Sequence, residues 1–388
     1  VRFSVSTKRL VRPERTHLNP SMIRPILALL VTAPLAFAET PIADLPVKID
    51  AADKALRFSG RWADTDPAGP KAAWPGSQVT IRFNGSAVNA RLQGKNGDRW
   101  QAVIDGKPGT VITMKTEPTL FSLASDLPVG DHTLSLTKIT EANCGTAQFQ
   151  GFQIHGKPLP PISPERRIEI IGDSISAGYG VEGKSQNEKF SPTTENNLLT
   201  YGSVTARKFG ADFTCLAWSG KKLWPNNTLP ELYDLALPAD PKSTWDFAKM
   251  KADVVLINLA TNDFGPGNPE EEGWVKAYVT LLERIRKNHP DAVIYGAVGP
   301  MITDTYSKSK NALTTARRYI QTALDERKKA GDEKVRFIEF ATQGKNGFGS
   351  DWHPNIKQNQ IMADTFVKAI EADLGWKPAA LDASGWVE

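Results

Sequence analysis

The sequence predicts two folded domains in tandem, an all-β sandwich followed by an α/β domain built on a parallel sheet. Three observations predict this fold class. The chain has 388 residues, which is more than a single ordinary hydrophobic core accommodates. Residues from about 45 to 154 contain short strand-like segments separated by turn signals, whereas residues beyond 167 alternate between apolar strands and amphipathic helices. Four prolines fall in residues 155–167, where the first pattern gives way to the second.

Residues 1–38 are predicted to be a leader and not part of either domain. Within residues 22–38 the sequence has one basic residue, an apolar run from Ile26 to Val31 and then Ala36-Phe37-Ala38. This order is typical of a secretory signal peptide, and its apolar run is too short to span a membrane. The alternative is a buried first helix. We expect cleavage after Ala38, a secreted or periplasmic protein, and no stable membrane insertion.

The positive charge of the chain is concentrated in this leader. Six basic residues against Glu14 alone give residues 1–38 a net charge of +5, so the rest of a chain with net charge +4 carries −1. The pI of about 8.8 therefore comes from the leader. The folded part offers no overall basic charge of the kind that binds nucleic acid, and we expect no nucleic-acid partner.

Residues 39–156 are predicted to form the sandwich, of the jelly-roll type. Many short strands at regular spacing are typical of such folds, and no helix-length periodic segment interrupts them. Asn84-Gly85 and Asp105-Gly106 are dipeptides that favour tight hairpin turns. The candidate strands are VKID, LRFSG, QVTIRF, AVNARL, RWQAVID, TVITM, TLFSLA, HTLSLTKI and FQGFQI.

Residues 157–388 are predicted to form the α/β domain. Near-continuous apolar strands separated by amphipathic helices indicate a parallel sheet covered on both faces. In such open sheets a binding site lies beyond the carboxyl ends of the strands. The candidate strands are RIEIIG, ADFTCLAW, ADVVLINLA, AVIYGAV and KVRFIEF, and helices are expected near residues 200–209, 230–237, 272–288, 311–330 and 356–373.

Residues suited to nucleophilic catalysis follow four of these strands. Ser174 stands at a strand-to-helix turn, where it offers a hydroxyl group and a backbone N–H. Gly220 follows the second strand, and glycine lets a backbone N–H approach a ligand closely. Asn262 follows the third strand, and its amide could donate to an oxyanion. His353 follows the fifth strand and could act as a general base.

This ordered set resembles the SGNH hydrolase superfamily, also called the GDSL type, over about residues 167–373. The four blocks of that family contribute Ser, Gly, Asn and His at the same strand ends. The resemblance implies a three-layer, flavodoxin-like fold in which Ser174 is the nucleophile and His353 is its base. It also implies an oxyanion hole made by the N–H groups of Ser174 and Gly220 and by the Asn262 side chain.

The sandwich, together with LLTYGSVTARKFGAD, ELYDLAL and WDF, is similar to carbohydrate esterase family 2. Members of that family place a jelly roll before the esterase domain and remove acetyl groups from plant cell-wall polysaccharides. The resemblance implies a secreted serine esterase of the acetylxylan esterase type, acting on an acetylated xylan- or glucomannan-type partner. The aromatic residues near the four blocks, Tyr179, Trp224 and Trp352, are candidates for stacking on sugar rings, with core packing as the alternative.

Two positions depart from the superfamily pattern. Ala260 stands where the third block usually has glycine, which matters only if the backbone there needs a positive φ. Ser350 stands where the fourth block usually has the aspartate that orients the histidine. Asp351, two residues before His353, is the only nearby acid. The resemblance therefore implies a Ser–His dyad whose imidazole is oriented either by a main-chain carbonyl group or by Asp351.

Each candidate also has a purely structural alternative. Ser174 could be a helix N-cap, Gly220 an ordinary turn glycine, and Asn262 a residue that satisfies a turn. For Asp263 we favour such a structural role, as a helix N-cap. The remaining histidines are poorer candidates for the base, because they lie in the leader, in the sandwich or linker, or at a helix end before proline: His17, His132, His155 and His289.

Other classes of function lack their signatures. No G-x-S-x-G elbow and no cluster with metal-ligand spacing occurs, and we expect no metal and no cofactor. Cys144 and Cys215 fall in different predicted domains, and we expect two buried thiols. We expect a monomer. A lipase or thioesterase of the same superfamily, or a catalytically inactive carbohydrate-binding protein, are the alternative functions.

Overall fold

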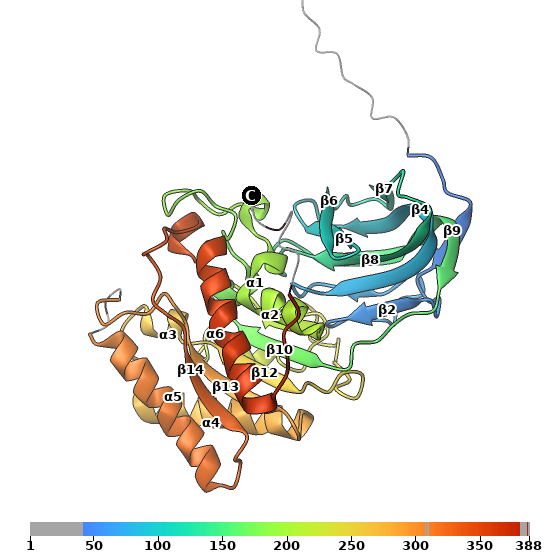
Figure 1. The fold of residues 1–388 in the computed structure, drawn as a ribbon. Coiled ribbons are helices and arrows are strands. Elements are labelled where there is room, and N and C mark those ends of the chain that lie inside the picture. The colour runs from blue at the N-terminus through green and yellow to red at the C-terminus, as the bar shows by residue number, and fades with distance from the viewer. Residues whose placement is uncertain (1–41, 307, 309, 381–385, 387–388) are drawn as a thin grey trace, which may run out of the picture. The chain divides into compact units, whose positions relative to one another are not determined.

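The computed structural model describes residues 42–306, 308, 310–380 and 386 (Figure 1). The predicted leader and its signal peptide lie outside these residues, so export stays a prediction. None of the described helices is long and apolar enough to cross a membrane. The described chain forms a nine-stranded antiparallel β arrangement followed by a five-stranded parallel sheet with helices.

The first half contains nine strands whose pairings are all antiparallel, along the main order β1-β9-β4-β8-β5-β6. The long strand β4 organises this half, because it pairs with β2 and β8 near its start and with β9 and β7 further on. One apolar core fills it. The strands are β1 (Val47–Asp50), β2 (Leu56–Ser59), β3 (Lys71–Ala72), β4 (Gln78–Gly94), β5 (Arg99–Ile104), β6 (Lys107–Thr113), β7 (Thr119–Ala124), β8 (Gly130–Lys138) and β9 (Ala147–Leu159).

Of the two predicted hairpin turns, one is confirmed and one is wrong. Asp105 and Gly106 have φ values of 50° and 80° and connect β5 to β6, as a tight hairpin turn requires. Asn84-Gly85 lies inside β4, which merely shifts register against β9 just after Gly85. A Cβ on Gly85 would lie 2.0 Å from the His155 carbonyl oxygen. Glycine is therefore needed here for the close approach of two strands and not for a turn.

The connection to the second half is shorter than the proline pattern predicts. Strand β9 continues to Leu159, so residues 155–159 pair with β4 although they belong to the predicted linker. The proline at position 158 is paired opposite Phe83, at the end of the ladder. The extended connection between β9 and the next strand is therefore residues 160–166.

The second half has the predicted parallel sheet, with strand order β11-β10-β12-β13-β14. Alternate residues of one strand point to opposite faces: Val255 and Ile257 pack in a core with α4 and α5, whereas Val254 and Leu256 pack in another with α2 and α6. This is the predicted three-layer arrangement. Its elements are β10 (Arg167–Gly172), α1 (Ser174–Ala177), α2 (Tyr201–Phe209), β11 (Asp212–Ala217), β12 (Val254–Asn258), α3 (Thr261–Phe264), α4 (Glu271–Asn288), β13 (Val293–Val298), α5 (Ala312–Lys329), β14 (Val335–Glu339) and α6 (Ile356–Leu374).

The helix predicted near residues 230–237 is wrong, because only the 3₁₀ turn Pro230–Leu232 forms there. The buried Arg61 side chain of the first half donates to the main-chain oxygens of Tyr233 and Leu235. Trp74 Nε1 also donates to the Leu235 oxygen, at 3.2 Å. These carbonyl groups accept from distant side chains, so the local helical pattern does not continue.

Candidate active site

The structure brings Ser174 and His353 together at the carboxyl ends of the parallel strands. Ser174 is the first residue of α1, separated from the end of β10 by Asp173 alone, and His353 follows the 3₁₀ turn Ser350–Trp352. The Ser174 Oγ lies 2.8 Å from His353 Nε2. The helix N-cap is Asp173, whose carboxylate accepts the Ile175 N–H at 3.0 Å. Ser174 is therefore not the cap, and its hydroxyl is left to the imidazole.

The main chain orients the imidazole. His353 Nδ1 lies 3.1 Å from the main-chain oxygen of Asp351. A carbonyl oxygen can only accept, so Nδ1 carries the hydrogen and Nε2 presents a lone pair to Ser174 Oγ. Asp351 and Trp352 have φ values of 47° and 68°. These values lie in the left-handed region, which residues other than glycine rarely adopt. This conformation turns the Asp351 carbonyl toward the imidazole.

The Asp351 carboxylate bonds other groups and not His353 Nδ1. It accepts hydrogen bonds from Lys189 Nζ at 2.8 Å, from the Tyr179 hydroxyl at 3.0 Å and from the Phe190 N–H at 2.9 Å. The hydrogen bond from Lys189 is the main reason why the pKa of Asp351 is lowered. The carboxylate thus fixes the loop that supplies the carbonyl oxygen.

Tyr179, a predicted sugar-stacking residue, instead contacts the imidazole in this structure. Its ring centroid is 4.2 Å from that of His353 and 4.3 Å from that of Phe190, with the Phe190 ring nearly parallel. Burial lowers the pKa of His353 to about 4, and the hydrogen bond to the Asp351 carbonyl opposes this only in part. The imidazole is therefore neutral at ordinary pH, as a base that accepts a serine proton must be.

Two of the predicted oxyanion donors are backbone N–H groups. Neither the Ser174 N–H nor the Gly220 N–H has a hydrogen-bond partner among the described residues. Gly220 has a φ of 79°, and a Cβ there would meet nothing within 4 Å, so glycine is required by its backbone conformation alone. Asn262 Nδ2 donates to the Lys221 oxygen at 2.9 Å and is 3.5 Å from the Asp173 carboxylate, a distance that leaves one hydrogen weakly held.

Ala260 is not a harmless replacement for glycine. Its φ is 133° and its ψ −29°, a region that glycine adopts freely and alanine does not. It precedes α3, the short helix that carries Asn262. Backbone strain of this kind costs roughly 1–3 kcal/mol and persists where the surrounding structure imposes it. The third block therefore keeps its backbone shape in spite of the substitution.

Asp263 has a structural role, although not the predicted one of a helix N-cap. It lies inside α3, and its carboxylate accepts the N–H groups of Leu223 and Trp224 at 3.1 and 3.0 Å. It also accepts Trp274 Nε1 at 2.9 Å. Burial raises the pKa of Asp263 to about 6, against the lowering effect of these hydrogen bonds. The residue fixes the loop after Gly220 to α4.

The two predicted tryptophans differ in exposure. Trp352, next to His353, is 55% exposed. Trp224 is half-buried and packs against the core that contains α4 and α5. A Cβ on Gly273 of α4 would lie only 2.7 Å from its ring. Trp352 is therefore free to meet a ligand, whereas the contacts of Trp224 are largely those of packing.

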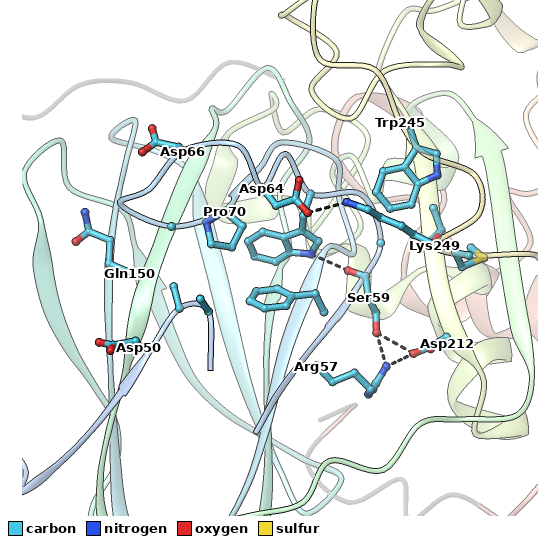
Figure 2. A pocket seen from close by; sticks show the side chains of 18 of the residues that line it. Asp50, Arg57, Ser59, Asp64, Asp66, Pro70, Gln150, Asp212, Trp245 and Lys249 are labelled. Atoms are coloured by element: carbon cyan, nitrogen blue, oxygen red, sulfur yellow. Dashed lines mark hydrogen bonds and ion pairs between the residues drawn. The ribbon is translucent and has the colours of Figure 1, made fainter. Parts of the chain in front are cut away.

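A cavity of about 890 Å³ lies away from the dyad, lined by residues of both halves (Figure 2). Some of its polar side chains bond one another: Lys249 pairs with Asp64 at 2.7 Å, and Asp212 accepts from both Arg57 and Ser59. Among the described residues no cluster of potential metal ligands occurs. Cys144 and Cys215 are buried free thiols, as predicted.

Comparison with known proteins identifies the family. Residues 58–162 match the family described as Carbohydrate esterase 2 N-terminal, and residues 170–361 match the GDSL-like Lipase/Acylhydrolase family. A solved family two carbohydrate esterase from Clostridium thermocellum, in complex with cellohexaose, is 38% identical with a TM-score of 0.78. That match covers 83% of this chain and 99% of the other. The chain belongs to the family two carbohydrate esterases.

Two curated relatives place this esterase further. The cellulase/esterase CelE of Acetivibrio thermocellus is 38% identical over 331 residues, which is 83% of this chain but 40% of CelE, so the chain spans about two fifths of that protein. An acetylxylan esterase / glucomannan deacetylase of Cellvibrio japonicus is 25% identical over 342 residues, 84% of this chain and 91% of that protein. The predicted family, fold class and class of enzyme, a carboxylic ester hydrolase, are confirmed.

Sequence reasoning missed the residues that support the dyad from outside the four blocks. Lys189 and Phe190 lie in a polar loop with no motif, yet both bond the Asp351 carboxylate. The sequence signal for them was Asp351 itself, because a carboxylate that does not accept from the imidazole needs other hydrogen-bond donors. Which partner it takes depends on the folded loop.

Proposed function

We propose that this family two carbohydrate esterase is an exported serine esterase that removes acetyl groups from xylan- or glucomannan-type polysaccharide through an acyl-enzyme. One observation carries the proposal: a serine hydroxyl lies 2.8 Å from a neutral imidazole, and the backbone N–H of that serine has no partner among the described residues. Nucleophile, base and oxyanion donors are the three parts that acyl transfer needs.

In the acylation step, Ser174 Oγ attacks the acetyl carbonyl carbon while His353 Nε2 takes the hydroxyl proton. The carbonyl oxygen becomes an oxyanion, which accepts hydrogen bonds from the Ser174 and Gly220 N–H groups and from Asn262. Collapse of this intermediate breaks the bond to the sugar oxygen, which receives the proton from His353. The sugar hydroxyl leaves, and the acetyl group stays on Ser174.

Deacylation repeats this chemistry with water as the nucleophile. His353 Nε2 takes a proton from water as the water oxygen attacks the acetyl-enzyme, and it returns a proton to Ser174 Oγ as acetate leaves. Both steps pass through a protonated imidazole. The Asp351 carbonyl oxygen stabilises that state by accepting the Nδ1–H bond, although this acceptor does not carry the full negative charge of a carboxylate.

The substrate part of the proposal rests on the relatives and on one exposed side chain. The Cellvibrio japonicus relative is named for acetylxylan and glucomannan, and the Clostridium thermocellum structure contains cellohexaose. Exposed Trp352 offers a flat apolar surface next to the dyad, which suits a sugar ring. Export rests on the signal-peptide pattern in residues 22–38.

The test compares wild type with Ser174→Ala on p-nitrophenyl acetate, p-nitrophenyl octanoate and acetylated xylan, glucomannan and pectin, with acetate release as the readout. We expect acetyl esters to be far better substrates than octanoyl esters, and Ser174→Ala to lower kcat by about 10³-fold or more. Equal kcat/KM for the two chain lengths would indicate a lipase or thioesterase. No turnover and no labelling of Ser174 by a fluorophosphonate would indicate a binding protein. Amino-terminal sequencing of secreted protein tests cleavage after Ala38.

A further inference from the structure

The Gly220 N–H belongs to the central peptide of a β-turn. Lys221 N–H donates to the Trp218 oxygen at 3.2 Å, which places Ser219 and Gly220 at the two central positions. A φ of 79° at the second central position is typical of a type II turn. The alternative type I turn differs mainly by a flip of the peptide between the two central residues. That peptide carries the Gly220 N–H, so the turn type decides where this donor points.

Side chains also hold the peptides around the central one. After it, Asn227 Nδ2 donates to the Gly220 oxygen at 3.0 Å, and Asn262 Nδ2 donates at 2.9 Å to the Lys221 oxygen, one peptide further along the chain. Both asparagines belong to the α/β half. The peptide before the central one is different, because the Ser219 N–H donates to the Glu141 carboxylate at 2.6 Å.

Glu141 comes from the β-sandwich half, where it follows β8. Its side chain is 1% exposed, and its own N–H donates to the carboxylate of Glu195 at 3.1 Å. A buried carboxylate is costly unless hydrogen bonds satisfy it, and burial raises the pKa of Glu141. The hydrogen bond from the Ser219 N–H is the largest influence that opposes this rise, so the turn is a main partner of the buried carboxylate.

We propose that Glu141 is a positioning residue for the esterase site: its carboxylate holds the Ser219–Gly220 turn so that the Gly220 N–H faces the reacting carbonyl oxygen. The proposal rests on the proposed function, because the oxyanion hole matters only to an active enzyme. It gives the β-sandwich half a part in catalysis, since that half supplies the acceptor. The effect belongs to the transition state, where the oxyanion forms, and not to substrate binding.

The experiment measures kcat and KM for p-nitrophenyl acetate in variants of the full chain, with thermal unfolding as the check on folding. Glu141→Ala leaves the Ser219 N–H without an acceptor, and we expect kcat to fall by about 30-fold or more while KM changes less than about threefold, since loss of a whole oxyanion donor costs about 10²–10³. Glu141→Gln keeps an acceptor oxygen at the same reach, and we expect kcat within about fivefold of wild type.

A second substitution tests the turn itself. Proline suits the first central position of a type II turn and has no N–H, so Ser219→Pro removes the orphaned donor and favours the same turn. Glu141→Ala also vacates the space that the proline ring needs. We therefore expect Glu141→Ala/Ser219→Pro to recover most of the kcat that Glu141→Ala loses. A double variant as inactive as the single one would overturn the proposal.

Arg99→Ala is the matched control. Arg99 of β5 also joins the two halves, through the main-chain oxygens of Pro192 and Glu195, but it does not touch the turn. We expect it to lower the unfolding temperature and leave kcat within about twofold of wild type. A Glu141→Ala enzyme that unfolds cooperatively and keeps kcat within about threefold of wild type overturns the proposal. If Glu141→Ala does not fold, Glu141→Asp replaces it, and a kcat at or above that of Glu141→Gln is then the contrary result.

The two proposals fail in different ways. If wild type and Ser174→Ala release acetate equally, the proposed function is wrong, and the positioning role of Glu141, which rests on it, is overturned as well. If wild type is active and Ser174→Ala is not, the Glu141 series tests positioning alone. Fluorophosphonate labelling of Ser174 in each Glu141 variant confirms that the nucleophile and its base are intact.

Discussion

The main-chain oxygen of Asp351 lies 3.1 Å from His353 Nδ1, while the carboxylate of the same residue bonds Lys189 and Tyr179. The positive φ of Asp351 places these two groups on different partners. In a conventional triad the carboxylate itself accepts the Nδ1–H. Here a neutral carbonyl accepts it, so the orientation of the imidazole depends on the shape of one loop.

Replacing Asp351 by its amide should therefore be mild. Asparagine tolerates a positive φ, and it keeps an acceptor for Tyr179 or Phe190. We expect Asp351→Asn to lower kcat by no more than about 30-fold, or about 2 kcal/mol, whereas His353→Ala abolishes activity. Steady-state kinetics on p-nitrophenyl acetate checks this. A loss near 10⁴ with unchanged folding, as in a triad, would show that the negative charge of Asp351 is required.

His353 should stay neutral in weak acid. Burial lowers its pKa from 6.5 to about 4, so the active, neutral imidazole persists above about pH 4 and is lost as pH falls through it. The same depressed pKa means that stability from this residue is present above 6.5 and decreases toward pH 4. NMR titration of the histidine Cε1–H signals, assigned with His353→Ala, measures the pKa directly. A midpoint near 6.5 would mean that the imidazole is solvated.

Ala260→Gly should stabilise the protein. The substitution removes the strain of alanine at a φ of 133°, worth roughly 1–3 kcal/mol, and adds an unfolded-state cost of about 0.4–1 kcal/mol. We expect a net gain of about 1 kcal/mol in denaturant unfolding and kcat within about twofold of wild type. Ala297→Gly, at the buried fifth position of the six-residue strand β13, is the control and should destabilise. A loss of stability for Ala260→Gly would contradict the backbone conformation described here.

Gly220→Ala should separate a catalytic glycine from a merely permissive one. Gly220 and Gly210 both have a positive φ, 79° and 58°, and open space where a Cβ would lie. Alanine therefore costs each about 1–2 kcal/mol of backbone strain. We expect both variants to lose similar stability. Only Gly220→Ala should also lose kcat, by about tenfold or more, because alanine disfavours the type II turn that directs this N–H. Equal kcat values for Gly220→Ala and Gly210→Ala would show that the Gly220 N–H is not part of the oxyanion hole.

Trp352→Ala should weaken the use of sugar substrates alone. The exposed ring adjoins His353, so its loss should raise KM for an acetylated oligosaccharide by about tenfold, or about 1.4 kcal/mol. The kcat/KM for p-nitrophenyl acetate, which has no sugar, should stay within about twofold. Trp376→Ala, at a ring that packs on Phe209, is the control and should leave both substrates unaffected. Equal losses on both substrates would assign Trp352 to the folding of the histidine loop.

Local patterns in the sequence were sufficient to predict the elements whose conformation depends on their own residues. The inner strands β12 and β13 are apolar runs buried at every position, and the predicted positions of all five parallel strands agree with β10 to β14. The Asp105-Gly106 turn needs only its own two residues. Asn84-Gly85 has the same signal, yet the approach of β9 decides its conformation, and that strand is far away in the sequence.

The sequence by itself determined the two-part fold, the four blocks and the candidates Ser174, Gly220, Asn262 and His353, because each depends on a local pattern and on strand order. Only the tertiary structure decided which group orients the imidazole and what holds the oxyanion turn. Asp351 offers both a carboxylate and a carbonyl oxygen, and a loop conformation selects between them. Glu141 meets Ser219 across 78 residues of chain, a contact that no spacing rule predicts because packing between the halves creates it.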